Sequence, residues 1–478
     1  MVNVFKKLLD SPTILSWSSV FVRFGSALFV LPLTLKVFSP LEQSFWFLLT
    51  TVTGFAMLAD SGFGSTLVRA VSYFKAGAKE LPQNREEYEE KLEMTDEGPN
   101  LEKLERLLST SYRIYFFINI FMVVILLTAG VGMVWNIMQL GSNRLDFWIA
   151  YAMVILNSSM SIMGVKWSSF VRGLGYIKLE SRYGLIQGLF QIIVFIILLS
   201  FGLKPVYLIG YMTFQVIARF FYLRRLVIKW FKDQGIELGA PQFDKGLFKS
   251  LWSSTWRFGG LSWGVFAVNS GTSVVISQLK DPVMMASFLL TQRIVTFISN
   301  MAKAPFYTNI PIIYELTAKK DIEGLKKKSS EYIFVGLSLL VGALGAILLF
   351  GNWGLELLGV ETRFVPFWIL LIIIVSEVLE IHSSYHAGLY ISTNHIPFLW
   401  PATISGVLII AAGFYVMPIY GVLGVVLVKL IIQLFYNYWY SVKLSLQLLN
   451  WNFFEYLAML PVYGFKGITN KIKFLKGK

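Results

Sequence analysis

Seven charged side chains lie deep within long apolar runs of the chain, where ionisable groups are costly and usually functional. They are Arg23, Arg257, Arg293, Lys429, Asp60, Glu377 and Glu380. An arginine binds phosphate oxygens through two parallel hydrogen bonds and keeps its charge, so the bases suit a phosphate-bearing anion. The acids suit a proton or cation relay or, equally, structural ion pairs with these bases. Four bases over three acids leave a net positive interior, which favours an anionic ligand.

Helical spacing groups some of these charges on common faces. Glu377 and Glu380 share one face of a predicted helix. On another predicted helix Lys429 lies on one stripe with Gln433 and Asn437. Charges in apolar helices should therefore face one another or an aqueous cavity, because facing lipid would cost about 2.5 to 3.5 kcal/mol each.

The composition shows which solvent surrounds these helices. The chain has 478 residues, of which 55% are hydrophobic and only 15% charged, and its mean hydropathy is +0.62. A soluble globular protein could not cover such a chain with polar surface, so most of the solvent is lipid. There is no cysteine, which excludes disulfides, thiolate nucleophiles and cysteine-based metal sites.

The apolar runs predict an all-α polytopic membrane protein, because about 20 apolar residues cross the hydrocarbon layer. Twelve candidate spans cover residues 13–37, 43–74, 108–138, 147–171, 184–201, 206–223, 250–277, 284–316, 332–350, 365–388, 397–417 and 422–446. With both termini inside, the inner segments hold 27 Lys and Arg and the outer loops hold 5. This asymmetry predicts a multi-pass protein with cytoplasmic termini. It also accounts for the net charge of +14 without nucleic acid.

Basic residues at the inner ends of spans have a simpler explanation, because long side chains there can reach the headgroups. Six residues are interpreted in this way: Arg69, Arg113, Lys166, Arg219, Lys303 and Lys443. For Arg69 a second interpretation is kept, in which it binds phosphate at the inner mouth.

The layout predicts two six-helix lobes, residues 1–223 and 250–446, joined by a cytoplasmic linker at 224–249. A short loop containing X-Pro precedes a long span in each half, at Ser39-Pro40 and Asp281-Pro282, and such duplication is frequent in secondary transporters. Residues 447–478 form a predicted amphipathic basic tail, and the acidic segment 75–107 a solvated helix or hairpin. We expect a monomer.

The sequence Asp60-Ser61-Gly62-Phe63-Gly64, with Arg69 five residues on, resembles a family motif. It is similar to the "D-aliphatic-G-aliphatic-G … R" ending of the second helix in Wzx-type flippases, the polysaccharide transporter branch of the multidrug/oligosaccharidyl-lipid/polysaccharide (MOP) exporter superfamily. The end of the first span, "LPLTLKVFSPLEQSFWFLL", is similar to the same family. Asp60 and Arg69 would point to opposite faces of a continuous helix, and the two glycines provide a possible break.

The resemblance implies a two-lobed protein of about twelve helices with a V-shaped central cavity open to alternate sides. Members move an undecaprenyl-diphosphate-linked oligosaccharide from the inner to the outer leaflet of the plasma membrane, for O-antigen, capsule or similar polysaccharide. Related flippases hold the diphosphate with cavity arginines. Arg23 matches the first of these by position, Arg257 and Arg293 are candidates in the second lobe, and Lys429 assists. Other polysaccharide assembly proteins are possible partners.

Three alternatives stay open at this stage. An ion-coupled exporter of drugs or organic cations from the same superfamily would want an acidic cavity. A membrane glycan polymerase or glycosyltransferase would want a sizeable external loop with carboxylates, and the outer loops are short. His382 and His386 have the spacing of a metal pair, but we predict no metal site, because cysteine is absent and only His395 remains. No nucleotide motif occurs, and no cofactor is expected beyond a coupling cation or proton.

Overall fold

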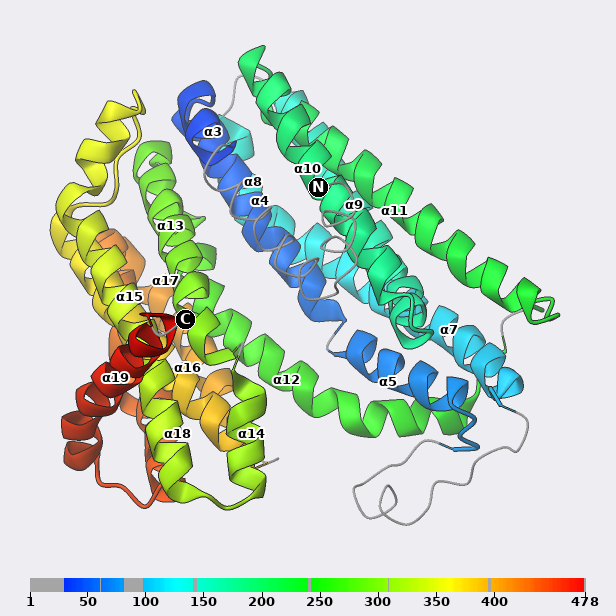
Figure 1. The fold of residues 1–478 in the computed structure, drawn as a ribbon. Helices are drawn as coiled ribbons and strands as arrows, with labels where there is room; N and C mark the ends of the chain where they lie inside the picture. Colours follow the sequence, from blue (N-terminus) through cyan, green and yellow to red (C-terminus); the bar gives the residue numbers. More distant parts are fainter. Residues whose placement is uncertain are drawn as a thin grey trace. The chain divides into compact units, whose positions relative to one another are not determined.

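The structure is a computed structural model that describes residues 30–60, 62–80, 98–140, 144–239, 242–307, 309–393 and 397–476. Within these ranges the chain is a succession of helices joined by short turns (Figure 1). It divides into two compact units, Met1–Ser262 and Trp263–Lys478. The lobe boundaries and the linker predicted from the sequence stay predictions.

In its described residues the first unit contains ten helical segments, the last of which, α12, continues into the second unit. They are α3 (Leu31–Val37), α4 (Pro40–Ala59), α5 (Phe63–Lys75), α7 (Leu101–Ile125), η2 (Leu126–Gly130), α8 (Val131–Leu140), α9 (Arg144–Gly173), α10 (Ile177–Ser200), α11 (Pro205–Asp233) and α12 (Lys245–Ile276). Helix α9 is central to this unit, because α4, α5, α7 and α11 all pack against it.

The second unit holds the rest of α12 and the remaining helices. They are α13 (Pro282–Tyr307), α14 (Ile310–Ala318), α15 (Ile322–Leu357), α16 (Phe367–Ile391), α17 (Leu399–Ile432), η3 (Gln433–Asn437), α18 (Tyr438–Leu448) and α19 (Phe453–Lys476). Helix α15 packs against α13, α16 and α19, while α16 packs against α17 and α18. The last helix docks closely on α15, since a Cβ on Gly464 would lie 2.2 Å from the ring of Phe334.

Local sequence signals begin several of these helices. Ser39 and Glu42 form a capping box at the start of α4, with Pro40 in the first turn. Asp281 accepts hydrogen bonds from the amides of Val283 and Met284 at 2.9 and 3.1 Å, which caps α13 in the same way. Both X-Pro pairs predicted to open a long span therefore do begin a helix.

Eight helices of the described part are long and apolar enough to cross a membrane. One of them, Leu101–Leu140, contains the π-helical segment η2, and another, Leu399–Leu448, covers the last two predicted spans. Within the latter the chain turns at Gly421 (φ 58°, ψ −147°), where a short loop was expected. The predicted all-helical, multi-span architecture is confirmed. The number twelve stays a prediction, because most of the first predicted span lies outside the described residues.

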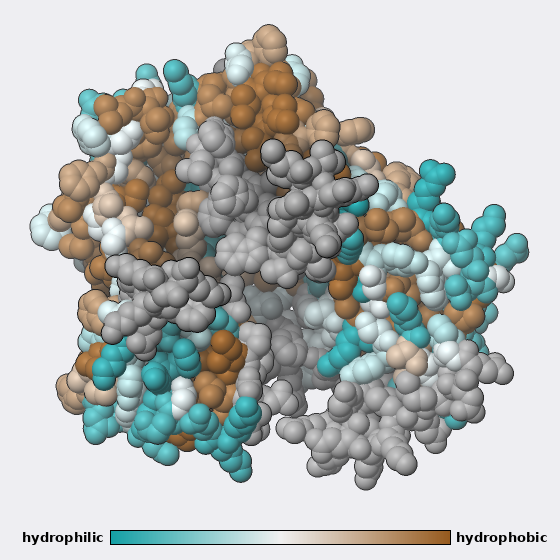
Figure 2. Space-filling view, in the orientation of Figure 1, coloured by the Kyte–Doolittle hydropathy of each residue, from teal (hydrophilic) through white to brown (hydrophobic). Residues whose placement is uncertain are grey.

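The surface of the helices fits a lipid solvent. Large apolar side chains lie exposed along α7, including Phe116, Phe117 and Phe121, which are 54%, 67% and 56% accessible. Figure 2 shows hydrophobic side chains over much of the face in view and hydrophilic ones gathered toward other parts of it. Contiguous apolar surface of this extent is what membrane helices present to acyl chains.

Candidate functional site

The helix that contains the Asp60 motif is interrupted at the motif. Helix α4 ends at Ala59 and α5 begins at Phe63, and between them Gly62 adopts a left-handed conformation (φ 82°, ψ 5°). The Asp60 carboxylate accepts from the amide of Gly64 at 3.1 Å and from the hydroxyl of Tyr115 at 2.8 Å. Asp60 therefore caps the second half-helix and ties it to α7. The break expected at these glycines is confirmed.

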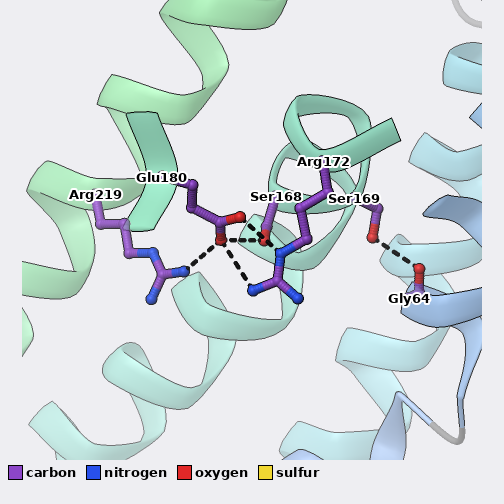
Figure 3. A network of polar contacts seen from close by, with 6 residues as sticks. All are labelled: Gly64, Ser168, Ser169, Arg172, Glu180 and Arg219. Carbon is purple, nitrogen blue, oxygen red and sulfur yellow. Dashed lines mark hydrogen bonds and ion pairs between the residues drawn. The ribbon is translucent and has the colours of Figure 1, made fainter. Parts of the chain in front are cut away.

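The second glycine of the motif has a packing role. A Cβ on Gly64 would lie 2.8 Å from Val165 Cγ1, so α5 can approach α9 this closely only with glycine. The Ser169 hydroxyl on α9 donates to the Gly64 carbonyl at 3.0 Å (Figure 3). Arg69 lies on α5 with its side chain exposed.

A buried acid that sequence reasoning missed lies beside this contact. Glu180, at the start of α10, is 5% exposed and accepts from Arg172 at 2.6 Å and from Arg219 at 2.8 Å. Arg172 donates a second bond at 3.2 Å, and the Ser168 hydroxyl is a third donor at 2.6 Å. Figure 3 shows the carboxylate between Arg219 and the Arg172–Ser168 pair. Arg219 was expected only to reach the headgroups, and the structure shows that it also forms an ion pair with Glu180. The sequence signal for this ion-pair cluster was Glu180 itself, a single acid among basic residues in the first turn of an apolar helix.

Lys166 contradicts the prediction that its side chain reaches the lipid headgroups. Its side chain on α9 is fully buried, and its Nζ has no hydrogen-bond partner in the described part of the chain. The ammonium lies 4.2 Å from the ring centroid of Tyr112, so an aromatic face takes the place that headgroups were expected to fill. The prediction fails because the side chain is buried, with its ammonium near Tyr112 of α7 and Arg224 of α11.

The candidate phosphate-binding bases fall into three cases. Arg23 lies outside the described residues, and for Arg257 the structure describes the backbone of α12 but not the side chain. Arg293 is exposed near the middle of α13, and in the described part of the chain no charge or hydrogen-bond partner acts on it. The structural ion pair considered between Arg293 and the glutamates of α16 is therefore not formed.

Glu377, Glu380 and Lys429 come together in the second unit. The Ser299 hydroxyl donates to Glu377 Oε1 at 2.6 Å, and the Gln433 side chain donates to Glu380 through a short hydrogen bond. Lys429 is 5% exposed, and its charge acts on Glu380 together with those of Lys303 and Glu377. The shared face of the two glutamates and the stripe of Lys429 and Gln433 thus meet in one partly buried cluster.

Polar contacts continue from this cluster along α16 and α18. Ser383 and Ser441 are hydrogen-bonded at 2.7 Å, and His386 is bonded to Ser445. The two histidines contact each other through their Nε2 atoms at 3.2 Å, and His382 also contacts the Tyr456 hydroxyl at 2.8 Å. We call this row, from Glu380–Gln433 to His382–Tyr456, the polar seam. Within the described residues no group of three or more potential metal ligands occurs.

The fold of the chain matches those of solved membrane transporters. Its all-helical polytopic architecture, with many long apolar helices, is similar to that of MOP superfamily transporters of known structure. No family profile matches the chain, and no curated protein matches it.

Among solved structures, the chain is similar to an inward-facing MATE family multidrug resistance transporter (TM-score 0.59, 12% identity, covering 89% of this chain and 95% of that one). It is also similar to the lipid II flippase MurJ in an inward closed conformation (TM-score 0.56, 14% identity, covering 94% and 92%). A third similar structure is a MOP superfamily transporter from Pyrococcus furiosus, described as having a binding pocket of reverse polarity (TM-score 0.54, 12% identity, covering 95% and 98%).

Proposed function

We propose that the protein is a Wzx-type flippase that moves an undecaprenyl-diphosphate-linked oligosaccharide across the plasma membrane by alternating access. The fold supports a transporter, and both a lipid flippase and drug exporters share it, so the fold alone does not choose between them. The choice comes from the charges within the spans.

The observation that carries the proposal is Arg293. It is exposed near the middle of a helix whose one other charged residue is Lys303, and in the described part of the chain no partner neutralises it. A guanidinium at this depth would be costly against acyl chains. A diphosphate headgroup would supply the missing anion and suit the planar fork of arginine. Arg23, Arg257, Lys429 and Arg69 are proposed to complete the path for that headgroup.

The cluster of Glu377, Glu380 and Lys429 is proposed as the coupling element. Both glutamates are hydrogen-bonded, and the charges of two lysines act on Glu380, so protonation of the glutamates or pairing with a cation would change the charge balance of the second unit. Asp60 is a less suitable relay, because its carboxylate already caps α5 and accepts from Tyr115.

The test uses the full chain in liposomes with an undecaprenyl-diphosphate-linked sugar labelled for mass spectrometry, and an impermeant glycosidase to measure outer-leaflet arrival. Arg293→Ala is expected to slow transport at least tenfold, which corresponds to the loss of one charge-assisted hydrogen bond. Arg293→Lys should retain part of the rate, because it keeps the charge without the fork. Equal rates for Arg293→Ala and the parent protein would remove Arg293 from the mechanism.

Further outcomes of the same assay separate the alternatives. Transport of an organic cation without any lipid-linked sugar would identify a drug exporter. Lengthened or transferred glycan would identify an enzyme. If Glu377 belongs to a proton relay, the parent rate will depend on a pH gradient and that of Glu377→Gln will not.

A further inference from the structure

The first unit has a cavity with aromatic walls whose residues play no part in the proposed transport function. It has a volume of about 390 Å³ and lies where the start of α5, the middle of α7 and the start of α12 meet. Its walls include Phe63, Phe117, Phe243, Phe248 and Trp252, and its polar group is Arg113. We call it the Arg113 slot.

The aromatic walls form a connected series. The ring centroids of Phe63 and Trp252 are 5.9 Å apart, those of Trp252 and Phe248 6.0 Å, and those of Phe248 and Phe243 5.6 Å. The Arg113 guanidinium carbon lies 6.0 Å from the Phe243 ring centroid. Trp252 and Phe117 remain 48% and 67% accessible, so the slot is open to whatever surrounds the helices.

The depth of the slot follows from the charges along α7. Charged residues occur throughout its first turns, Arg113 is the last of them, and residues 114–143 contain none. Arg113 therefore stands where the headgroup layer ends and the apolar span begins. Tryptophan is frequent at this level, because its ring is apolar and its N–H is polar, and Trp252 lies in the same slot.

The charge of Arg113 is not balanced within the described part of the chain. Its side chain is exposed, and the contact found for it there is with the Phe243 ring. The acid next to that ring, Asp244, accepts hydrogen bonds from the Gly246 and Leu247 amides at 2.8 and 3.0 Å and so caps α12. A guanidinium at a membrane boundary, beside an apolar slot, is complementary to a phosphate that carries an acyl chain.

We propose that the Arg113 slot binds one anionic phospholipid from the leaflet on the side where α7 begins. The lipid phosphate accepts hydrogen bonds from the Arg113 guanidinium, and an acyl chain lies against Phe117 and the rings of Phe248 and Trp252. Since the slot joins α5, α7 and α12, the bound lipid would hold these three elements together. This site is independent of the substrate proposed above.

The test measures lipid retention by native mass spectrometry of the full chain, purified with equal amounts of phosphatidylglycerol and phosphatidylcholine. The parent protein is expected to keep phosphatidylglycerol in preference. Arg113→Ala should weaken its binding roughly tenfold, as expected for loss of a hydrogen bond to a charged group. Arg225→Ala is the matched control, because Arg225 is an exposed arginine on α11 that does not line the slot.

A second arm keeps the inference falsifiable if Arg113→Ala fails to fold. Phosphatidylglycerol with brominated chains quenches nearby tryptophan, so part of the quenching should disappear in Trp252→Phe. Arg113→Lys should lose less of it, because the lysine keeps the charge without the planar fork. Equal retention of both lipids by the parent protein would overturn the proposal. Equal losses in Arg113→Ala and Arg225→Ala would also overturn it, since they indicate general attraction to a basic surface.

Discussion

At the residue scale, the Asp60 motif shows how a few residues shape a helix break. Asp60 supplies the cap, Gly62 the left-handed turn, and Gly64 the close approach to α9. The family resemblance rested on these same residues. In this structure each of these residues has a role in shaping the helix break. A role of the motif in transport would therefore be indirect, through the geometry of that break.

Replacing Gly62 tests the break directly. Gly62→Ala should lower the free energy of unfolding by about 1–2 kcal/mol, because a Cβ is strained at positive φ. Gly342→Ala is the control, since Gly342 lies inside α15 with nothing within 4 Å of an added Cβ, and should be neutral or slightly stabilising. Thermal unfolding in detergent measures both. Equal effects of the two substitutions would show that the left-handed conformation is not required.

At the element scale, the polar seam joins α16 to η3 and α18. The π-helical segment η3 contains both Gln433 and Asn437, and Asn437 donates to Gln433 at 2.9 Å while Gln433 donates to Glu380. Single-turn π-helices often mark functional sites, because they reorient side chains that an α-helix would point elsewhere. Here Gln433, held by Asn437, meets Glu380, a half-buried acid on a helix of mostly apolar residues.

Removing the hydrogen-bond donor of Gln433 should reveal the free-energy cost of placing the Glu380 carboxylate among apolar helices. Gln433→Leu is expected to lower the free energy of unfolding by about 1–3 kcal/mol, because it leaves the half-buried Glu380 carboxylate without this hydrogen bond. Gln447→Leu, at an exposed position of α18, is the matched control. Restored stability in the double variant Gln433→Leu, Glu380→Gln would confirm that the penalty belongs to the carboxylate. A Gln433→Leu protein as stable as the control would show that this contact contributes little.

At the scale of the whole molecule, the multi-pass architecture is established, and its orientation in the membrane is a prediction from the Lys and Arg distribution. One ion pair in the predicted outer region is suited to an aqueous surface. Lys204 donates to Asp146 at 2.8 Å, and this hydrogen bond raises the pKa of the exposed Lys204. It links the starts of α9 and α11, although such exposed pairs contribute little to stability.

The orientation can be measured because the chain has no cysteine of its own. Glu361→Cys lies in the exposed turn before α16, and Gln234→Cys lies just after α11. In intact cells an impermeant maleimide should label position 361 at once and position 234 only after the membrane is opened. The opposite pattern would reverse the orientation, and labelling of both sites would contradict an odd number of spans between them.

The sequence by itself determined that lipid surrounds most of the chain, that the apolar runs are helices, and where capping residues begin them. Lipid cannot satisfy backbone polar groups, so long apolar runs must become helices, and short-range signals such as Ser39 with Glu42 begin them. The shared face of Glu377 and Glu380 also followed from spacing alone. These properties depend on residues within one or two turns of each other.

Tertiary structure decided which distant residues meet. Arg219 reaches Glu180 across 39 positions and Gln433 reaches Glu380 across 53, while Lys166 turns to an aromatic face and Arg293 finds no acid in the described part of the chain. These outcomes depend on how each helix rotates and how closely it packs. In lipid that packing comes from van der Waals contacts and interhelical hydrogen bonds, which a pattern of apolar and polar residues does not encode.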